Sequence, residues 1–150
     1  MIMNPNSHKN DLYNTLLILS RNIFFYKKIE LPDTFETRIY LMFMHFSVMM
    51  IVFKQKGKKF DQKSYDSLFH NIENNLREMG FGDVSVNKKM KDFNKLLYDI
   101  LLKLNKKDNS ETFKINEKLI INYFKELKNH KTTKYTDFER YFFNFYNFCF

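Results

Sequence analysis

Residues 39–53 read Ile-Tyr-Leu-Met-Phe-Met-His-Phe-Ser-Val-Met-Met-Ile-Val-Phe, and this stretch decides the fold. Only His45 and Ser47 interrupt its apolar side chains. As a helix it is about 22 Å long at 1.5 Å per residue, which is shorter than the roughly 30 Å hydrocarbon core of a bilayer. A helix that is apolar on all sides is normally enclosed by other helices. We therefore predict an apolar central helix over about residues 33–56, in preference to a helix that contacts a membrane.

The composition of the whole chain favours an all-α fold. The chain has 150 residues, a usual length for one domain, and 44% of them are hydrophobic. Three Gly and two Pro give a β-rich fold few residues on which to turn. We predict one helical domain over residues 1–150, built as a bundle of about six helices.

Apolar spacing and capping residues place the other helices. The central helix is expected to start at Asp33, with Glu36 completing a capping box. Gly80 occupies the position of a left-handed C-terminal cap, Gly82 gives a second turn position, and Asp83 is expected to cap the next helix. The apolar stripe of the helix before Gly80 runs from Tyr65 to Met79. The expected helices, besides the central one, begin and end near residues 11–28, 61–79, 83–104, 116–129 and 136–150, with a linker over 105–112.

The chain is basic and has little capacity for cysteine chemistry. Its net charge is +8, and its lysines gather in two groups. Such groups suit RNA or anionic lipid, and they are equally well explained as solvated helix faces. Cys149 stands alone, so an internal disulfide and a cysteine metal cage are excluded. The two groups are Lys54, Lys56, Lys58, Lys59 and Lys63, and then Lys88, Lys91 and Lys95.

The chain carries no recognisable catalytic motif. Asp66, His70 and Glu73 share one face of a helix at positions i, i+4 and i+7, a spacing that can hold a metal. A solvated polar face with i,i+4 pairing is the favoured interpretation. We expect a protein that is not an enzyme, with no catalytic residue, cofactor or metal site.

Two polar residues of the central helix require partners if they are buried. Arg38 and His45 are costly to remove from water without carboxylate or carbonyl groups. Asp33, Glu78 and Asp83 are the available carboxylates, which leads to the hypothesis of a buried polar brace between helices.

Two groups of apolar residues have an open interpretation, either as core or as a surface for an apolar partner. Both are expected to be mainly core, although methionine surfaces adapt to varied partners and exposed aromatic faces mark docking sites. The first group is Met42, Met44, Met49 and Met50. The second is the aromatic face of the last helix, Phe138, Tyr141, Phe142, Phe145, Phe148 and Cys149.

Several segments resemble the ubiquinol–cytochrome c chaperone family. They are Leu12-Tyr13, Arg21 and Tyr26, then Asp33-Thr-Phe-Glu-Thr-Arg38 with His45, and then Asp66, Glu73, Leu76-Arg-Glu-Met-Gly-Phe-Gly-Asp83, Val86 and Lys88-Lys-Met-Lys91. The resemblance covers about residues 11–98. The part over about 113–150 is predicted as a C-terminal helical extension from periodicity alone.

The resemblance implies an all-α assembly chaperone of the respiratory cytochrome bc complex. Such a protein binds newly made cytochrome b or another subunit of that complex, near the membrane and the ribosome and with a small partner protein. The residues expected to bind the client or brace the fold are Asp33, Arg38, His45, Asp66, Arg77, Glu78, Gly80, Gly82, Asp83, Lys88 and Lys89.

The sequence also leads to expectations about where the protein is located and about an alternative function. The polar segment over residues 1–10 resembles no targeting sequence. We therefore expect a bacterial protein in the cytoplasm, peripheral at the inner membrane, or on the matrix side if the source is eukaryotic. The alternative is a basic RNA- or ribosome-binding helical module, although no specific nucleic acid is expected.

Overall fold

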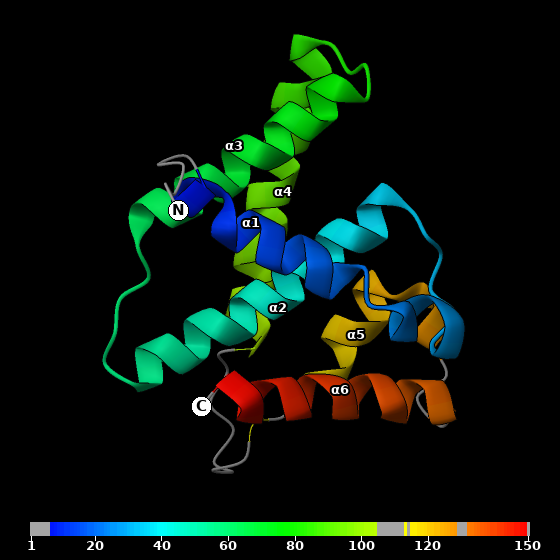
Figure 1. Cartoon of the computed structure of the whole chain (residues 1–150). Coiled ribbons are helices and arrows are strands. Elements are labelled where there is room, and N and C mark those ends of the chain that lie inside the picture. Colours follow the sequence, from blue (N-terminus) through cyan, green and yellow to red (C-terminus); the bar gives the residue numbers. More distant parts are fainter. Residues whose placement is uncertain (1–6, 105–112, 114, 129–131, 150) are drawn as a thin grey trace.

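In the computed structural model, helices surround one central helix, α2 (Phe35–Gln55) (Figure 1). The structure describes residues 7–104, 113, 115–128 and 132–149. These residues contain no strand, and the prediction of a bundle of six α-helices is confirmed. The other elements are α1 (Ser7–Ser20), the π turn η1 (Phe24–Lys28), α3 (Gln62–Glu78), α4 (Asp83–Leu104), α5 (Glu117–Tyr123), the 3₁₀ turn η2 (Lys125–Leu127) and α6 (Thr133–Cys149).

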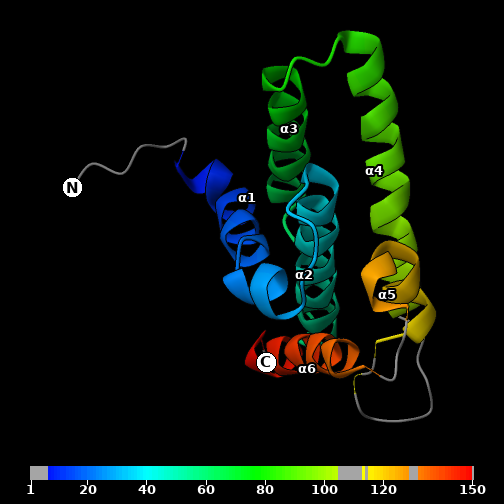
Figure 2. The same cartoon turned by 90° about the vertical axis from the view of Figure 1, so that its right-hand side faces the viewer.

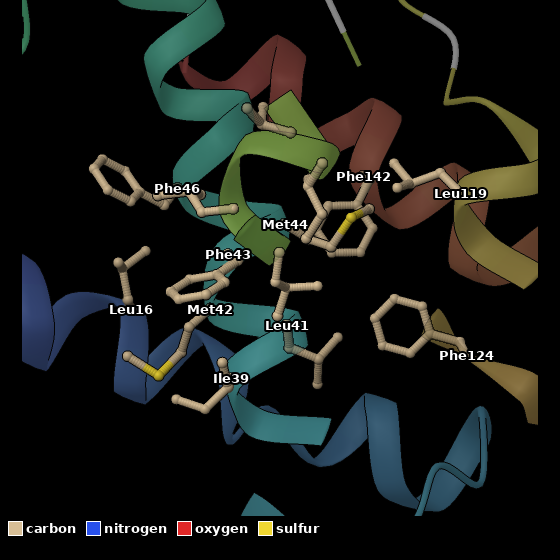
Figure 3. Packing of buried hydrophobic residues seen from close by; sticks show 14 of the residues in the cluster. Leu16, Ile39, Leu41, Met42, Phe43, Met44, Phe46, Leu119, Phe124 and Phe142 are labelled. Atoms are coloured by element: carbon tan, nitrogen blue, oxygen red, sulfur yellow. The ribbon is translucent and has the colours of Figure 1, made fainter. Parts of the chain in front are cut away.

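The helix α2 is buried on all sides over its middle. Every residue from Leu41 to Val48 is buried, and α1, α4 and α6 all contact α2. In Figure 3, side chains of α2 lie among Leu16 of α1, Leu119 of α5 and Phe142 of α6. The helix is long and apolar enough to cross a membrane, but 67% of its most apolar window is buried within the protein. These contacts make α2 the central helix of the core.

The first turn of α2 is capped by Thr34, and the prediction of Asp33 as the cap is wrong. The Thr34 side chain accepts a hydrogen bond from the backbone N–H of Thr37 at 3.2 Å. The carboxylate of Asp33 instead accepts from Arg38. A threonine one residue later supplies the same type of acceptor, and this frees Asp33 for the ion pair.

The prediction of one helix over residues 11–28 is also wrong. The helix α1 ends at Ser20, whose hydroxyl donates to the carbonyl of Leu17 at 2.8 Å. The side chain of Asn22 then accepts from the backbone N–H of Phe24 at 3.1 Å, so that η1 starts in a new direction. Short polar side chains that bond to nearby backbone groups compete with a continuing helix.

Helices α3 and α4 form a hairpin that projects beyond the other helices (Figure 2). The helix α3 starts near the expected position, and Asp61 caps it, because its side chain accepts from the backbone N–H of Lys63. The part of the hairpin that lies near α2 belongs to the core, because Phe43 of α2 packs there against Phe69 of α3 and Phe93 of α4. The rest of the hairpin extends away from that core.

The C-terminal helices differ from the prediction at their ends. The helix α5 starts after Asn116 as expected, but it stops at Tyr123 because the buried ring of Phe124 packs against Tyr40 and Phe138 with a non-helical backbone. The helix α6 starts three residues earlier than expected, since the Thr132 hydroxyl accepts from the N–H of Tyr135. The linker predicted over residues 105–112 lies outside the described residues.

The α6 helix offers a matched pair for testing the core. Phe142 is fully buried against His45 and Phe138, whereas Phe148 of the same helix is 85% exposed. We expect Phe142→Ala to lower the free energy of unfolding by about 3–5 kcal/mol and Phe148→Ala to change it by less than about 0.5 kcal/mol. Urea denaturation measures both. Equal losses for the two variants would contradict this assignment of the core.

Candidate functional site

The polar residues expected to brace the helices lie in separate places, and Asp33 is the expected candidate that pairs with Arg38. Arg38 pairs with Asp33 at the start of α2, with Nη2 2.7 Å from Oδ1. Asp83 instead pairs with Arg77 at the other end of the α3–α4 hairpin, and Glu78 is exposed beside it. Arg38 remains half-exposed at the edge of the core. Its positive charge is solvated by water and paired with Asp33, so no further carboxylate is required.

His45 is a fully buried residue that joins α2 to α6. Its Nδ1 lies 2.7 Å from the carbonyl oxygen of Leu41, and its Nε2 lies 2.7 Å from the hydroxyl of Tyr141. Because a carbonyl only accepts, Nδ1 carries the proton and Nε2 accepts from Tyr141. Burial lowers the pKa of His45 to about 4, which keeps the ring neutral near pH 7. His45 is thus a core residue with both ring nitrogens satisfied, one by a carbonyl as expected and the other by a hydroxyl.

The methionines and most aromatic residues of α6 also belong to the core. Met42 and Met44 are buried, and Met49 and Met50 are partly buried against the core. Phe138 and Phe142 of α6 are fully buried as well. This confirms that both groups are mainly core, and it leaves little of them for a client.

The turn between α3 and α4 is fixed by its backbone and by an ion-pair fork. Gly80 has φ +95°, its N–H donates to the carbonyl of Arg77, and the N–H of Phe81 donates to that of Leu76. These two bonds are a Schellman motif, which requires a left-handed residue at Gly80. The Arg77 guanidinium donates to Glu73 at 3.0 Å and to Asp83, and the bond to Asp83 contributes most to raising the pKa of Arg77. The fork therefore joins the end of α3 to the start of α4.

The tip of the hairpin is apolar and exposed. We call Met79, Phe81 and Val84 the apolar tip: Met79 is 54% exposed, Val84 is 85% exposed and Phe81 is partly exposed. Lys89 lies over the Phe81 ring, with Nζ 4.9 Å from its centroid. Exposed apolar side chains that lie together mark interaction surfaces. The apolar tip is therefore the strongest candidate for client binding among the described residues.

Sequence reasoning placed Met79 wrongly on the buried stripe of α3. The spacing of that stripe is correct, since Leu68, Ile72 and Leu76 are all buried. Met79 continues the same face past the point where other helices cover it, because the hairpin projects beyond the core (Figure 2). Periodicity identifies the face of a helix but does not show how far along that face a neighbouring helix extends.

A shallow groove of about 720 Å³ runs along the hairpin between α3 and α4. Asp66, His70 and Glu73 contribute to one wall, and Asn87, Met90 and Asn94 line the other. Asp66 accepts from Gln62 at 2.9 Å and Glu73 pairs with Arg77. Within the described part of the chain, no group of three His, Cys, Asp or Glu side chains is placed to hold a metal ion. The groove therefore contains Asp66 and Glu73 on the same hairpin that carries the apolar tip.

The signature residues thus gather mainly on the hairpin. Arg77, Glu78, Gly80, Gly82 and Asp83 form its turn. Exposed Lys88 and half-exposed Lys89 follow in α4, Asp66 lines the groove, and Asp33, Arg38 and His45 lie on or beside α2.

A comparison with protein families matches residues 27–142 to the family described as ubiquinol–cytochrome C chaperone. The chain belongs to this family. The match covers α2 to α5 and more than half of α6, so it includes the hairpin. It extends past residue 98, where the sequence resemblance ends, but it starts after Leu12, Tyr13, Arg21 and Tyr26 of that resemblance. Curated proteins and solved structures give no match to the chaperone.

The pH dependence of the chaperone's stability tests the state of His45. The pKa of His45 is about 4 when folded and about 6.5 when unfolded, so the unfolded state binds more protons between these values. His45 should therefore lower the free energy of unfolding as the pH falls from about 6.5 towards 4, by up to about 1.4 kcal/mol per pH unit. Urea denaturation across this range should show a flatter dependence for His45→Gln. The same slope in both proteins would contradict a buried, neutral His45.

The turn of the hairpin is tested by two substitutions at one position. Gly80→Ala puts a Cβ on a left-handed residue and should lower the free energy of unfolding by about 1–2 kcal/mol. Gly80→Asn should cost less, because Asn adopts this conformation more readily. Apart from the adjoining residues, no atom lies within 4 Å of the position that a Cβ at Gly80 would occupy, so crowding is not involved. Equal costs in thermal denaturation would contradict the backbone explanation.

Proposed function

We propose that this member of the ubiquinol–cytochrome C chaperone family is a non-enzymatic assembly factor that binds newly made cytochrome b. The observation that carries the proposal is the apolar tip, since it is exposed on a hairpin that bears most of the family signature. A chaperone for a membrane subunit must cover apolar segments before they reach their final place. Exposed apolar side chains in a fixed turn supply such a surface.

The rigidity of the turn supports binding by the tip. The Schellman bonds at Gly80 and the fork of Arg77 to Glu73 and Asp83 hold Met79, Phe81 and Val84 in fixed positions. A surface that is already ordered loses less conformational entropy when a partner binds. This gives the polar signature residues a role in presenting the tip, without any chemical step.

The groove below the tip offers a second contact for the same client. Its carboxylates, Asp66 and Glu73, lie beside the partly exposed ring of Tyr65 and thioether of Met90. The cytoplasmic ends of membrane helices are enriched in Lys and Arg. We propose that the tip binds an apolar helix end of cytochrome b and that the groove binds the adjoining basic loop. Another subunit of the cytochrome bc complex would use the same surface.

We further propose that the protein acts at the inner face of the membrane, in the bacterial cytoplasm or on the matrix side of the mitochondrial inner membrane. Newly made cytochrome b is available for binding on that side, as its chain enters the bilayer. The ribosome and a small partner protein are further proposed partners, and no part of the hairpin described above is assigned to them.

Capture from native membranes tests the client and the surface together. The tagged protein should co-purify cytochrome b, identified by mass spectrometry. Val84→Asp should reduce the captured amount by about tenfold, because burying one such side chain is worth about 1.5–3 kcal/mol. Aspartate suits the first turn of α4, so this variant should still fold.

Ile18→Asp is the matched control, because Ile18 is also apolar and 70% exposed but lies on α1. It should capture as much cytochrome b as the unchanged protein. Equal capture by the Val84→Asp variant would move the client surface away from the tip, and a capture that lacks cytochrome b altogether would overturn the proposed client.

A further inference from the structure

The end of the molecule opposite the hairpin tip carries a dense group of lysines beside an exposed aromatic ring. We call Lys54, Lys56, Lys58, Lys59 and Phe148 the basic corner. It lies where α2 and α6 both end, and Figures 1 and 2 show these ends far from the turn between α3 and α4. Lys54, Lys58, Lys59 and Phe148 are all exposed.

Two contacts hold the end of α6 against the end of α2. The Tyr146 hydroxyl donates to Oε1 of Gln55 at 2.6 Å, and Nζ of Lys56 donates to the carbonyl of Cys149 at 3.2 Å. Phe148 lies between these two contacts in sequence, and its side chain is 85% exposed. These contacts hold the last turn of α6, which carries Phe148, near the start of the lysine-rich loop.

Three lysines of the basic corner have no acidic partner within the described structure. Across the described residues, no carboxylate forms an ion pair with Lys54, Lys58 or Lys59, and Asp61 is the nearest acidic residue in sequence. Asp61 is occupied as the cap of α3, where it accepts from the N–H of Lys63 and the hydroxyl of Ser64. These three exposed ammonium groups therefore favour an anionic partner.

An anionic bilayer fits this surface better than RNA does. Single-stranded nucleic acid is bound by several aromatic rings that stack on successive bases. Nearby rings are packed: Phe53 and Phe60 lie against each other with centroids 5.1 Å apart, Phe60 also packs on Phe46, and Tyr146 stacks on Phe113. Phe148 is the ring of the basic corner that stays exposed. A single apolar side chain among lysines matches the lipid interface, where the ring enters the headgroup region and the ammonium groups contact phosphates.

We propose that the basic corner binds the surface of an anionic phospholipid bilayer. Lys54, Lys58 and Lys59 supply the electrostatic attraction, and Phe148 supplies the apolar insertion. Because the apolar tip lies at the opposite end of the molecule (Figure 2), a protein bound in this way presents the tip to the aqueous side. Only this last point, the use of the tip, rests on the proposed function. Lipid binding itself does not require any client.

Sedimentation with lipid vesicles tests the proposal with the purified full chain. The protein should bind vesicles of phosphatidylcholine with phosphatidylglycerol, and should bind phosphatidylcholine alone much more weakly. The Lys58→Gln/Lys59→Gln variant should bind the anionic vesicles roughly thirtyfold more weakly, at about 1 kcal/mol per lysine. Phe148→Ala should weaken binding severalfold at high salt, where the electrostatic part is screened.

A second pair of lysines controls for net charge. Lys91 and Lys95 are exposed on α4, away from the basic corner, and Lys91→Gln/Lys95→Gln makes the same change in charge. This variant should bind the vesicles nearly as well as the unchanged protein. Equal losses for both pairs would show that overall charge is responsible and would overturn the assignment to the corner.

Two further outcomes also overturn the proposal. One is equal binding to neutral and anionic vesicles, and the other is displacement of the protein from anionic vesicles by a small amount of single-stranded RNA. Because the vesicles contain no protein, failure here is distinguishable from failure to capture cytochrome b.

Discussion

Burial of α2 on every side sets the arrangement of the other helices. From Leu41 to Val48 each side chain lies in the core, whichever direction it faces, so no face of this part of the helix is left for water. The polar side chains of such a helix are removed from water and need hydrogen-bond partners within the protein. His45 has two, the carbonyl of Leu41 and the hydroxyl of Tyr141. The hydroxyl of Ser47 has no partner among the described residues, so its burial destabilises the core.

The same constraint separates the core from the surfaces that are available for binding. The methionines of α2 and the inner rings of α6 pack in or against the core. Apolar side chains are exposed at the projecting turn of the hairpin, at the opposite end where α2 and α6 finish, and at separate positions such as Ile18 and Leu102. Most of the residues that carry the sequence resemblance lie on the hairpin, where Arg77 pairs with Glu73 and Asp83. A protein with one apolar end and one basic end is well suited to connect two different partners.

Sequence reasoning identified the all-α fold, the central helix and the hairpin because their signals are local and repeated. The apolar run over 39–53 predicts a buried helix, and the glycines at 80 and 82 predict the turn between two helices. The break after Ser20 was missed because it depends on hydrogen bonds of Ser20, Asn22 and Tyr26 that compete with an otherwise helical pattern.

The candidate site was predicted less well, for a different physical reason. Asp33 was among the expected partners of Arg38, five residues away, but the pairing of Arg77 with Asp83 depends on how the turn between α3 and α4 brings two helix ends together. Tyr141, the partner of His45, is 96 positions away in the chain and has no local signal. The exposure of Met79 and Val84 depends on the length of the hairpin relative to its neighbours, which spacing along one helix does not contain.

The contact between His45 and Tyr141 also bears on how the chain is made. Synthesis proceeds from the N-terminus, so α2 leaves the ribosome long before α6, which covers one of its sides. During that interval the most apolar helix of the protein is incompletely enclosed, and pairing across such a long stretch of chain is slow to form. This member of a chaperone family therefore passes through a period in which its own most apolar helix is exposed while its chain is being synthesised.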